Sequence, residues 1–331
     1  MATLKDIAQR AGVTATTVSR VINNRGYISE GTRKKVYAAM EEMHYQPNEL
    51  ARAFSKQYTN TIGLIVPHIS HPFFIKVISN LESSAAEKGF KLLLCNSKEQ
   101  PEKEQDYLDM CISNRVAGIV LCSKYVQTRE FRKMNIPVVN LERGGDDDTI
   151  SVQCDNYQGG KLAAEHLIEC GCKNLLHFGG VAGKDMPADR RADGFSDICK
   201  KAGIPYRILV SDRLQYGSMH YEDFIRRALQ EFPDVDGIFA SSDLIASQVI
   251  QVGAQMGKRV PEDIQLIGFD DVMISMVTTP QITTIHQPVE EMTELCVEYI
   301  AKSLKNESVP QKIVLPVRLV QRGTTVLKTE I

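Results

Sequence analysis

Small polar and basic side chains suited to nucleic-acid recognition follow a tight turn near the start of the chain. In the stretch LKDIAQRAGVTATTVSRVIN, residues 4–23, apolar residues recur at helical spacing on both sides of a break at Gly12. Gly12 can adopt the left-handed backbone of a tight turn, and Thr14 can accept a hydrogen bond from the N–H groups that open a second helix. The side chains left outside on that second helix can enter a major groove and contact bases and phosphates. They are Ala15, Thr16, Thr17, Ser19, Arg20 and Asn23.

Taken alone, this stretch also fits an ordinary pair of amphipathic helices. The charge distribution favours DNA binding, because residues 1–60 carry 9 Lys and Arg against 5 Asp and Glu, whereas the remainder carries 30 against 36. A solvated helical face would also be basic, and the net charge of +4 is modest. Since 331 residues allow two or three domains, we expect a small nucleic-acid-binding module joined to an acidic body.

A third helix and a linker follow the two-helix unit. An apolar stripe behind a serine N-cap predicts a helix that closes a three-helix core and ends before Pro47. The next segment has helical composition but no core of its own. Arg52 near Phe54 would suit a helix that inserts an apolar wedge into a minor groove, although on this segment alone a flexible linker is preferred. We expect a headpiece over 1–46 and a hinge helix or linker over 47–60.

From residue 61 onward, short apolar runs alternate with segments of helical periodicity. This alternation predicts parallel sheets covered on both faces, and about 270 residues favour two sheets. Strands are expected at 62–66, 91–95, 118–122, 138–141, 174–178, 208–210, 237–240, 265–269, 312–315 and 317–320, and helices at 73–88, 101–114, 159–170, 191–202, 219–231, 243–256 and 290–304. We expect an N-lobe over about 61–156 and 288–315, and a C-lobe over about 157–287 and 316–331, around a cleft.

Polar side chains recur where the predicted strands end. Parallel sheets place ligand-binding loops at the carboxyl ends of their strands. Phe73 and Phe74 can stack on a sugar or base ring, and Arg191 with several carboxylates suits a ligand with many hydroxyl groups. For any one of these residues, a helix cap or an exposed loop charge is the more common role. Only together do they predict a polar binding cleft.

Signals for catalysis, cofactors and metals are weak. The glycines within 179–183 lack GxGxxG spacing, and neither GxxxxGK[ST] nor GxSxG occurs, although a catalytic site assembled from distant residues stays open. No histidine pair has metal-ligand spacing. Eight cysteines without a CxxC pair predict buried, reduced thiols in a cytoplasmic protein, and no apolar window approaches a membrane span. We therefore expect no enzyme, cofactor, metal or membrane partner.

Motifs typical of one family are spread over the whole chain. They are LKDIAQRAGVTATTVSRVINN, SEGTRKKVYAAMEEMHYQPNELAR, IGLIVPHISHPFF, DNYQGGKLAAEHL, RRADGF, IGFDD, TTIHQP and VRLVQRGTT. Together they resemble the lactose-repressor/galactose-repressor (LacI/GalR) family of bacterial transcription regulators. The resemblance implies an all-α helix-turn-helix headpiece, a hinge helix, and an α/β core of two Rossmann-like parallel-sheet lobes, like that of periplasmic sugar-binding proteins. It also implies a homodimer on pseudo-palindromic double-stranded operator DNA.

The resemblance assigns roles to headpiece residues. Ala15, Thr16 and Arg20 would read bases in the major groove, with Arg20 contacting guanine bidentately. The residues near phosphates would be Thr14, Thr17, Ser19, Asn23 and Tyr27. Phe54 stands where the family usually has a leucine that wedges into the central base step, and this departure leaves the kink geometry open.

In the core, the resemblance places a set of residues at effector-contacting positions. They are Phe73, Phe74, Ser123, Arg143, Asp155, Arg191, Ser242 and Asp270. Ser242 replaces a common asparagine, and Arg191 belongs to the family pattern R-x-x-G-[FY]. The purine-binding branch would have an arginine six residues before Arg191, where this chain has Asp185, so a sugar or sugar phosphate is favoured over a purine.

The resemblance thus implies a repressor whose operator affinity is changed allosterically by a small carbohydrate. Two rivals stay open. A corepressor- or partner-dependent regulator or activator would bind DNA more tightly with its ligand. A sugar-modifying enzyme with an incidental helical cap would turn its ligand over and would lack salt-dependent binding to duplex DNA.

Overall fold

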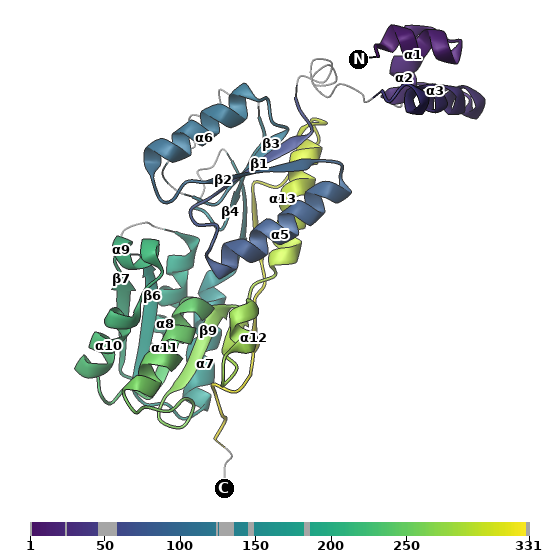
Figure 1. Ribbon diagram of the computed structural model, residues 1–331. Coiled ribbons are helices and arrows are strands. Elements are labelled where there is room, and N and C mark those ends of the chain that lie inside the picture. Colours follow the sequence, from purple (N-terminus) through teal and green to yellow (C-terminus); the bar gives the residue numbers. More distant parts are fainter. Residues whose placement is uncertain are drawn as a thin grey trace. The chain divides into compact units, whose positions relative to one another are not determined.

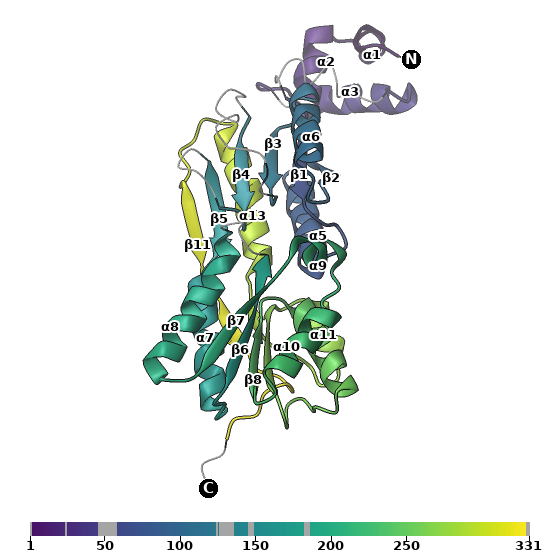
Figure 2. The same cartoon turned by 90° about the vertical axis from the view of Figure 1, so that its left-hand side faces the viewer.

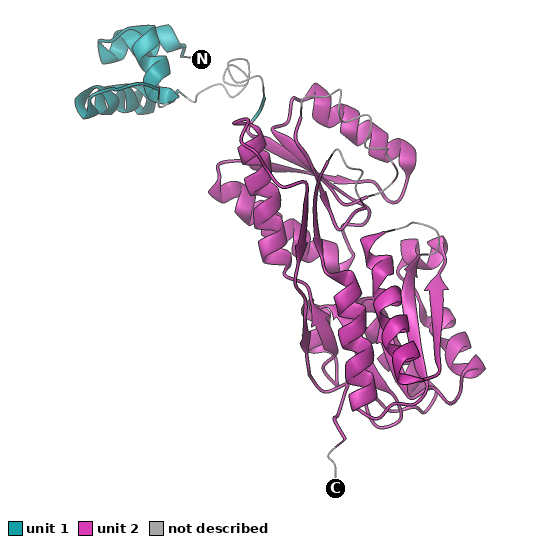
Figure 3. Ribbon diagram, turned by 180° about the vertical axis from the view of Figure 1, so that it is seen from behind, with its two compact units in different colours: residues 1–59 teal, residues 60–331 magenta. Residues whose placement is uncertain are grey.

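The computed structural model describes residues 2–23, 25–45, 58–123, 125, 136–144, 149–181 and 186–328. The chain divides into two compact units, Met1–Thr59 and Asn60–Ile331 (Figure 3). Each unit has its own hydrophobic core. The predicted minor-groove residues Arg52 and Phe54 lie outside the described residues, as does most of the predicted hinge.

The described part of the first unit contains three helices: α1 (Leu4–Ala11), α2 (Ala15–Ile22) and α3 (Glu30–Glu42) (Figure 1). Gly12 ends α1 in the left-handed region, with φ of 67°, and Thr14 starts α2 by accepting a hydrogen bond from Thr17 N at 3.1 Å. The predicted helix-turn-helix is confirmed. Its core consists of Ile7, Ala8, Val18, Val21, Val36 and Ala39.

The first sheet of the second unit has six parallel strands in the order β11-β5-β4-β3-β1-β2. Its strands are β1 (Thr61–Val66), β2 (Lys91–Asn96), β3 (Gly118–Leu121), β4 (Val138–Leu141), β5 (Ile150–Cys154) and β11 (Lys312–Leu315). Because side chains alternate along a strand, Leu64 packs toward α5 (Pro72–Glu87) and α13 (Val289–Ser303), whereas Ile65 packs toward α6 (Pro101–Ser113). Helices therefore cover both faces of this sheet (Figure 1).

The second sheet has the order β12-β10-β9-β8-β6-β7, with only β12 antiparallel to its neighbour. Its strands are β6 (Leu175–Val181), β7 (Tyr206–Ser211), β8 (Gly237–Ala240), β9 (Gln265–Asp270), β10 (Thr283–His286) and β12 (Arg318–Val320). Figure 2 shows α7 (Asn156–Glu169) and α8 (Arg190–Ala202) on one face and α10 (Glu222–Glu231) and α11 (Asp243–Gln255) on the other. The two predicted parallel-sheet lobes are confirmed.

Short elements complete the second lobe: the 3-10 turn η2 (Pro187–Asp189) and the helices α9 (Arg213–Ser218) and α12 (Met273–Val277). The chain passes from one sheet to the other three times, after β5, after β10 and after β11. Crossings of this kind hold two lobes around a shared cleft, and the carboxyl ends of both sheets contribute residues to it.

Two strands, β5 and β10, were not among the predicted strands. The sequence of β5, ISVQC, has no continuous apolar run. In β10 the polar residues Thr283 and Thr284 are fully buried. Their hydroxyls are satisfied, since that of Thr283 lies 2.8 Å from Thr325 Oγ1 and that of Thr284 donates to Asp243 Oδ1 at 2.6 Å. A pattern of hydropathy alone does not reveal such paired polar groups.

Helices α7 and α8 cross very closely, because each has a glycine at the contact. A Cβ at Gly160 would lie 2.0 Å from Arg191 O, and a Cβ at Gly194 would lie 2.0 Å from Tyr157 O. Any side chain at either position would therefore push the helices apart. The close crossing holds Arg191, near the start of α8, next to Asn156, at the start of α7.

All eight cysteines are buried and free of disulfide bonds, as predicted. Burial raises the pKa of Cys122, Cys154 and Cys296 above the usual thiol range. These thiols therefore behave as small apolar core residues.

Candidate functional site

Helix α2 carries the residues predicted to read bases. Thr16 and Arg20 are exposed, whereas Thr17 and Ser19 are half-buried. Ala15 is also half-buried and packs against the headpiece core. The outer face of α2 thus offers one long cation and short hydroxyl side chains, which are groups that contact DNA in a major groove. Base reading by these residues stays a prediction.

Local hydrogen bonds hold several residues that are predicted to lie near phosphates. The hydroxyls of Thr14 and Thr17 lie 2.9 Å apart, and Asn23 Nδ2 donates to Ser19 O at 2.8 Å. Tyr27, between α2 and α3, is 97% exposed. Its hydroxyl and ring are therefore accessible to a ligand of the headpiece.

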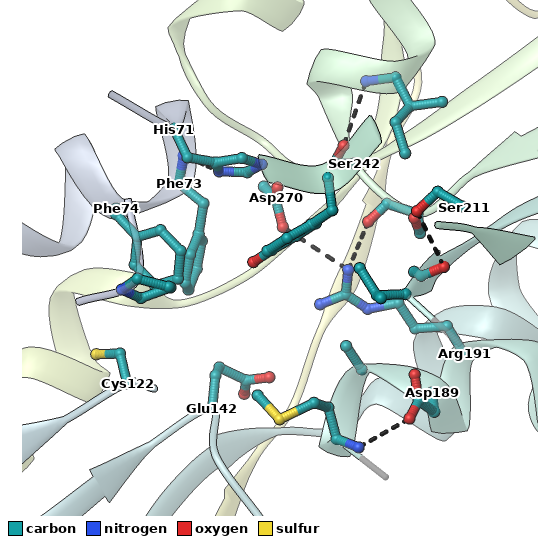
Figure 4. Close-up of a pocket in the computed structure, with 18 of the residues that line it drawn as sticks. His71, Phe73, Phe74, Cys122, Glu142, Asp189, Arg191, Ser211, Ser242 and Asp270 are labelled. Carbon is teal, nitrogen blue, oxygen red and sulfur yellow. Dashed lines mark hydrogen bonds and ion pairs between the residues drawn. The ribbon is translucent and has the colours of Figure 1, made fainter. Parts of the chain in front are cut away.

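A cavity lies between the two lobes at the carboxyl ends of their strands (Figure 4). Its walls come from the segments after β1 to β4 of the first sheet and after β6 to β10 of the second. Six of the eight predicted effector residues line it. They are Phe73, Phe74, Ser123, Arg191, Ser242 and Asp270. Within the described ranges, no group of three His, Cys, Asp or Glu side chains is arranged to hold a metal ion.

The first lobe contributes two aromatic rings, a histidine and the carboxyl groups of Glu99 and Glu142. Phe73 and Phe74 project from the first turn of α5 with ring centroids 5.2 Å apart (Figure 4). His71 caps α5, its Nδ1 accepting a hydrogen bond from Phe73 N at 3.3 Å. Burial lowers the pKa of His71 to about 4, so its ring is neutral near pH 7 and its proton is on Nε2. Glu142, at the end of β4, enters from the same lobe.

Arg191 is the central cation of the second lobe and is only 6% exposed. Its Nε donates to Asn156 Oδ1 at 2.7 Å and its NH1 donates to the Ser241 carbonyl. The guanidinium carbon lies 3.5 Å from the centre of the Phe269 ring. These contacts fix the plane of the guanidinium. Its remaining N–H groups can therefore bind a ligand in the cavity without a further loss of side-chain entropy.

Asp270 ends β9 beside Arg191, with 4.0 Å between Oδ1 and NH1. Gln287 Nε2 donates to the same carboxyl oxygen at 2.6 Å. Burial raises the pKa of Asp270 to about 7, against the opposing effects of Arg191 and Gln287. This carboxyl group therefore exchanges a proton near neutral pH, and it can either donate or accept a hydrogen bond from a ligand hydroxyl.

Asn156 joins the two lobes at the first chain crossing. Its Nδ2 donates to Glu142 Oε2 at 2.9 Å, while its Oδ1 accepts from Arg191 Nε. Glu142 also accepts a hydrogen bond from Cys154 N at 2.5 Å. One amide side chain therefore holds an anionic group of the first lobe and the cationic group of the second in fixed positions.

Two buried polar atoms in the cavity have no partner among the described residues. They are Ser123 Oγ, on a side chain that is 2% exposed in total, and Gln287 Oε1, on one that is 1% exposed. Leaving such an atom without a hydrogen bond costs about 1 to 3 kcal/mol. A polar ligand in the cavity would supply the missing partners.

The other two predicted effector residues do not line the cavity. Arg143 is buried, and its NH1 donates to Asn140 Oδ1 at 2.9 Å. Asp155 caps α7 by accepting from Gln158 N at 2.9 Å. The neighbour of each residue, Glu142 and Asn156, is the one that takes part in the cavity network, because successive residues leave a strand end in different directions.

Sequence reasoning missed four members of this network. Glu142 and Asn156 were given no role, while His71 and Gln287 lie inside the motifs IGLIVPHISHPFF and TTIHQP. For Glu142 the available signal was its position directly after a predicted strand, whereas Asn156 and Gln287 follow β5 and β10, which were not predicted. What the sequence lacked was the direction of each side chain.

A helix-turn-helix unit joined to a two-lobed core with a polar cavity is an architecture suited to a DNA-binding regulator with a small-molecule site. Family models agree with both parts. Residues 3–48 match "Bacterial regulatory proteins, lacI family", and residues 164–325 match "Periplasmic binding protein-like domain".

Full-length relatives identify the family. The chain is 33% identical to the ribose operon repressor of Halalkalibacterium halodurans, an alignment that covers 98% of this chain and 97% of the relative. It is 34% identical to the sucrose operon repressor of Pediococcus pentosaceus, over 97% and 98% of the two chains. The chain therefore belongs to the lacI family of bacterial regulatory proteins: it is a DNA-binding transcriptional repressor and not an enzyme.

Solved structures share the fold. A periplasmic binding protein/LacI transcriptional regulator from Alkaliphilus metalliredigens, complexed with D-xylulofuranose, is 32% identical with a TM-score of 0.73, over 81% of this chain and 100% of that one. The Lac repressor dimer bound to operator and the anti-inducer ONPF has a TM-score of 0.83 at 24% identity, over 98% and 99% of the two chains.

In the described part of this chain, no helix has the length and apolar character needed to cross a bilayer.

Proposed function

We propose that this repressor acts as a homodimer on a pseudo-palindromic operator and that a carbohydrate in the interlobe cavity changes its operator affinity. Relatives that repress ribose and sucrose operons support a carbohydrate effector, as does the similar core complexed with D-xylulofuranose. A repressor acts where the bacterial chromosome is, so the proposal places the protein in the cytoplasm.

The observation that carries the proposal is the chemistry of the cavity. Phe73 and Phe74 offer apolar faces to the C–H groups of a sugar ring, while Arg191, Asp270 and Glu142 offer donors and acceptors to its hydroxyls. The unpartnered oxygens described above add two further hydrogen-bonding positions. A ring with one apolar face and many hydroxyls matches this combination.

Binding between the lobes supplies a mechanism for allostery. A ligand that contacts residues of both lobes stabilises the lobe arrangement in which all of those contacts form. If operator binding by the dimer favours a different arrangement, the two binding events are coupled, typically by about 1 to 3 kcal/mol. Asn156 lies where a change in the lobe arrangement would be felt, since its side chain is hydrogen bonded to Glu142 of the first lobe and to Arg191 of the second.

The homodimer is proposed from family membership and from the symmetry that it gives to DNA recognition. Two copies of α2 would contact two half-sites, with Thr16 and Arg20 facing the bases. Arg20 would provide bidentate recognition of guanine. The residues Ala15, Thr14, Thr17, Ser19, Asn23 and Tyr27 would complete the contact surface.

Fluorescence anisotropy with a labelled pseudo-palindromic duplex from the protein's own promoter region tests the proposal. We expect tight, salt-sensitive binding that one sugar in a panel releases. Arg191→Ala should lose the sugar response and keep DNA binding, because Arg191 lies in the cavity and not in the headpiece. A full sugar response in Arg191→Ala would refute the assigned cavity. Binding that only strengthens with ligand would instead identify a corepressor.

A further inference from the structure

We infer that the cavity accepts an uncharged sugar and excludes the phosphate esters of that sugar. The inference rests on the proposed carbohydrate effector and narrows it to one chemical class. Four features of the cavity lead to it: its charge, the bonds already made by its cation, the capping of two of the helices that begin there, and the kind of hydrogen bond that it lacks.

The first feature is an excess of carboxyl groups. The described residues that line the cavity include four carboxyl groups, those of Glu99, Glu142, Asp189 and Asp270, and one guanidinium, that of Arg191. Asp270 is only partly charged near pH 7, because burial raises its pKa to about 7, but the other three carboxyl groups still outnumber the guanidinium. His71 adds no charge near pH 7, because burial lowers its pKa to about 4. In a partly buried cavity, charges interact through an effective dielectric far below that of water, so an added anion is repelled.

The second feature is that Arg191 is already engaged. Its Nε and NH1 donate to Asn156 and to the Ser241 carbonyl, and its charge lies close to Asp270. Two of the five N–H groups of the guanidinium are therefore already taken, which leaves a phosphate fewer of the paired N–H groups that normally bind it bidentately. A sugar hydroxyl needs only one of the remaining N–H groups.

The third feature concerns α5 and α11, two of the helices that begin at the cavity. A helix N-terminus is a common phosphate site because its first N–H groups are free. Here a side chain of the protein already caps each helix. His71 Nδ1 accepts from Phe73 N at the start of α5, and Ser242 Oγ accepts from Ile245 N at 3.2 Å at the start of α11. The N-termini of α5 and α11 are therefore already capped and do not offer a free end to a ligand anion.

The fourth feature is a demand for hydrogen-bond donors. Gln287 Oε1 is an acceptor that has no partner among the described residues, and Ser123 Oγ can also accept. The carboxylate oxygens of Glu142 accept as well. Sugar hydroxyls donate to such oxygens. The phosphate group of an ester has no hydrogen to donate at the position where it replaces a hydroxyl, and there it would face these oxygens with like partial charge.

Isothermal titration of the full-length protein with matched pairs tests this inference. The pairs are ribose with ribose 5-phosphate and sucrose with sucrose 6-phosphate. For whichever parent sugar binds, we expect its phosphate to bind at least about tenfold more weakly. A phosphate that binds as tightly as its parent sugar, or more tightly, would overturn the inference while leaving the carbohydrate effector in place. If a wide panel of sugars and phosphates gave no binding, the proposed effector itself would fail, and this inference with it.

A charge-removing variant tests the cause. Glu142→Gln keeps the shape of the side chain but removes one negative charge, so the ratio of the phosphate Kd to the sugar Kd should fall severalfold. Glu262→Gln, an exposed residue between α11 and β9, removes the same net charge away from the cavity and should leave the ratio unchanged. Operator binding without ligand serves as the folding control for both. If Glu142→Gln loses all ligand binding, Asp270→Asn provides the test at pH 8, above the pKa of about 7 at which the wild-type carboxyl loses its proton, and an unchanged ratio there contradicts the electrostatic cause.

Discussion

Replacing Gly194 by alanine should weaken ligand binding in the cavity, although Gly194 itself does not line the cavity. The new Cβ would lie 2.0 Å from Tyr157 O and 3.0 Å from Lys161 N, and real Cβ atoms essentially never come closer than 3.0 Å. The obstacle is backbone of α7, so α8 must move away by about 1 Å. Overpacking of this kind costs roughly 1 to 3 kcal/mol. The hydrogen bond from Arg191 Nε to Asn156 Oδ1, now 2.7 Å, would lengthen beyond useful range.

The assay combines urea denaturation with operator anisotropy. Gly194→Ala should lose about 1 to 3 kcal/mol of stability. Its operator binding should survive and its sugar response should weaken strongly, because Arg191 is displaced. Gly217→Ala is the matched control: Gly217 lies in α9 of the same lobe, and its new Cβ would meet nothing within 4 Å. This control should be neutral or more stable by about 0.4 to 1 kcal/mol. Wild-type stability and sugar response in Gly194→Ala would refute the reasoning.

Three further predictions concern the headpiece and the cavity. Thr14→Ala removes the N-cap of α2 and should cost about 1 kcal/mol of headpiece stability, measured by thermal unfolding; no change would argue against the cap. Arg20→Ala should lose about 1 to 3 kcal/mol on the preferred operator but little on a duplex altered at the contacted guanine; an equal loss on both would indicate a phosphate contact. Burial raises the pKa of Asp270 from 3.8 to about 7, so the folded chain keeps a proton that the unfolded chain has released. That contribution to stability should fall as pH rises from about 4 to about 7, and the stability of Asp270→Asn relative to wild type should rise over the same interval in urea titrations.

Much of the fold follows from apolar periodicity. The helix-turn-helix and ten of the twelve strands in the described part of the chain were predicted, because their apolar residues repeat with the period of the element that they form. β5 was not predicted because it has no continuous apolar run, and β10 was not predicted because its buried polar residues are paired across the fold, as Thr284 is with Asp243. The partners of such a residue lie far away in sequence, and hydropathy does not report them.

Some residues of the cavity were predicted from the sequence and others were not, as with the strands. Phe73, Arg191 and Asp270 were predicted from their types and motifs, and all three line the cavity. Glu142 was passed over in favour of its neighbour Arg143, whose guanidinium is turned toward Asn140. The sequence identifies the loop that ends each strand, but which of two adjacent side chains enters the cavity depends on the local backbone, here a Glu142 φ of 49°.

Because all eight cysteines are buried, the reactivity of their thiols can be used to measure how often the folded protein opens. A thiol reacts as the thiolate, and both solvent exclusion and the raised pKa of Cys122, Cys154 and Cys296 suppress that form in the folded chain. Alkylation therefore requires an opening event that brings a thiol into water. The time course of labelling would then measure how often each lobe opens, residue by residue. A bound effector that stabilises the lobes would slow the labelling of their cysteines. The assay would detect this effect without any fluorophore or tag.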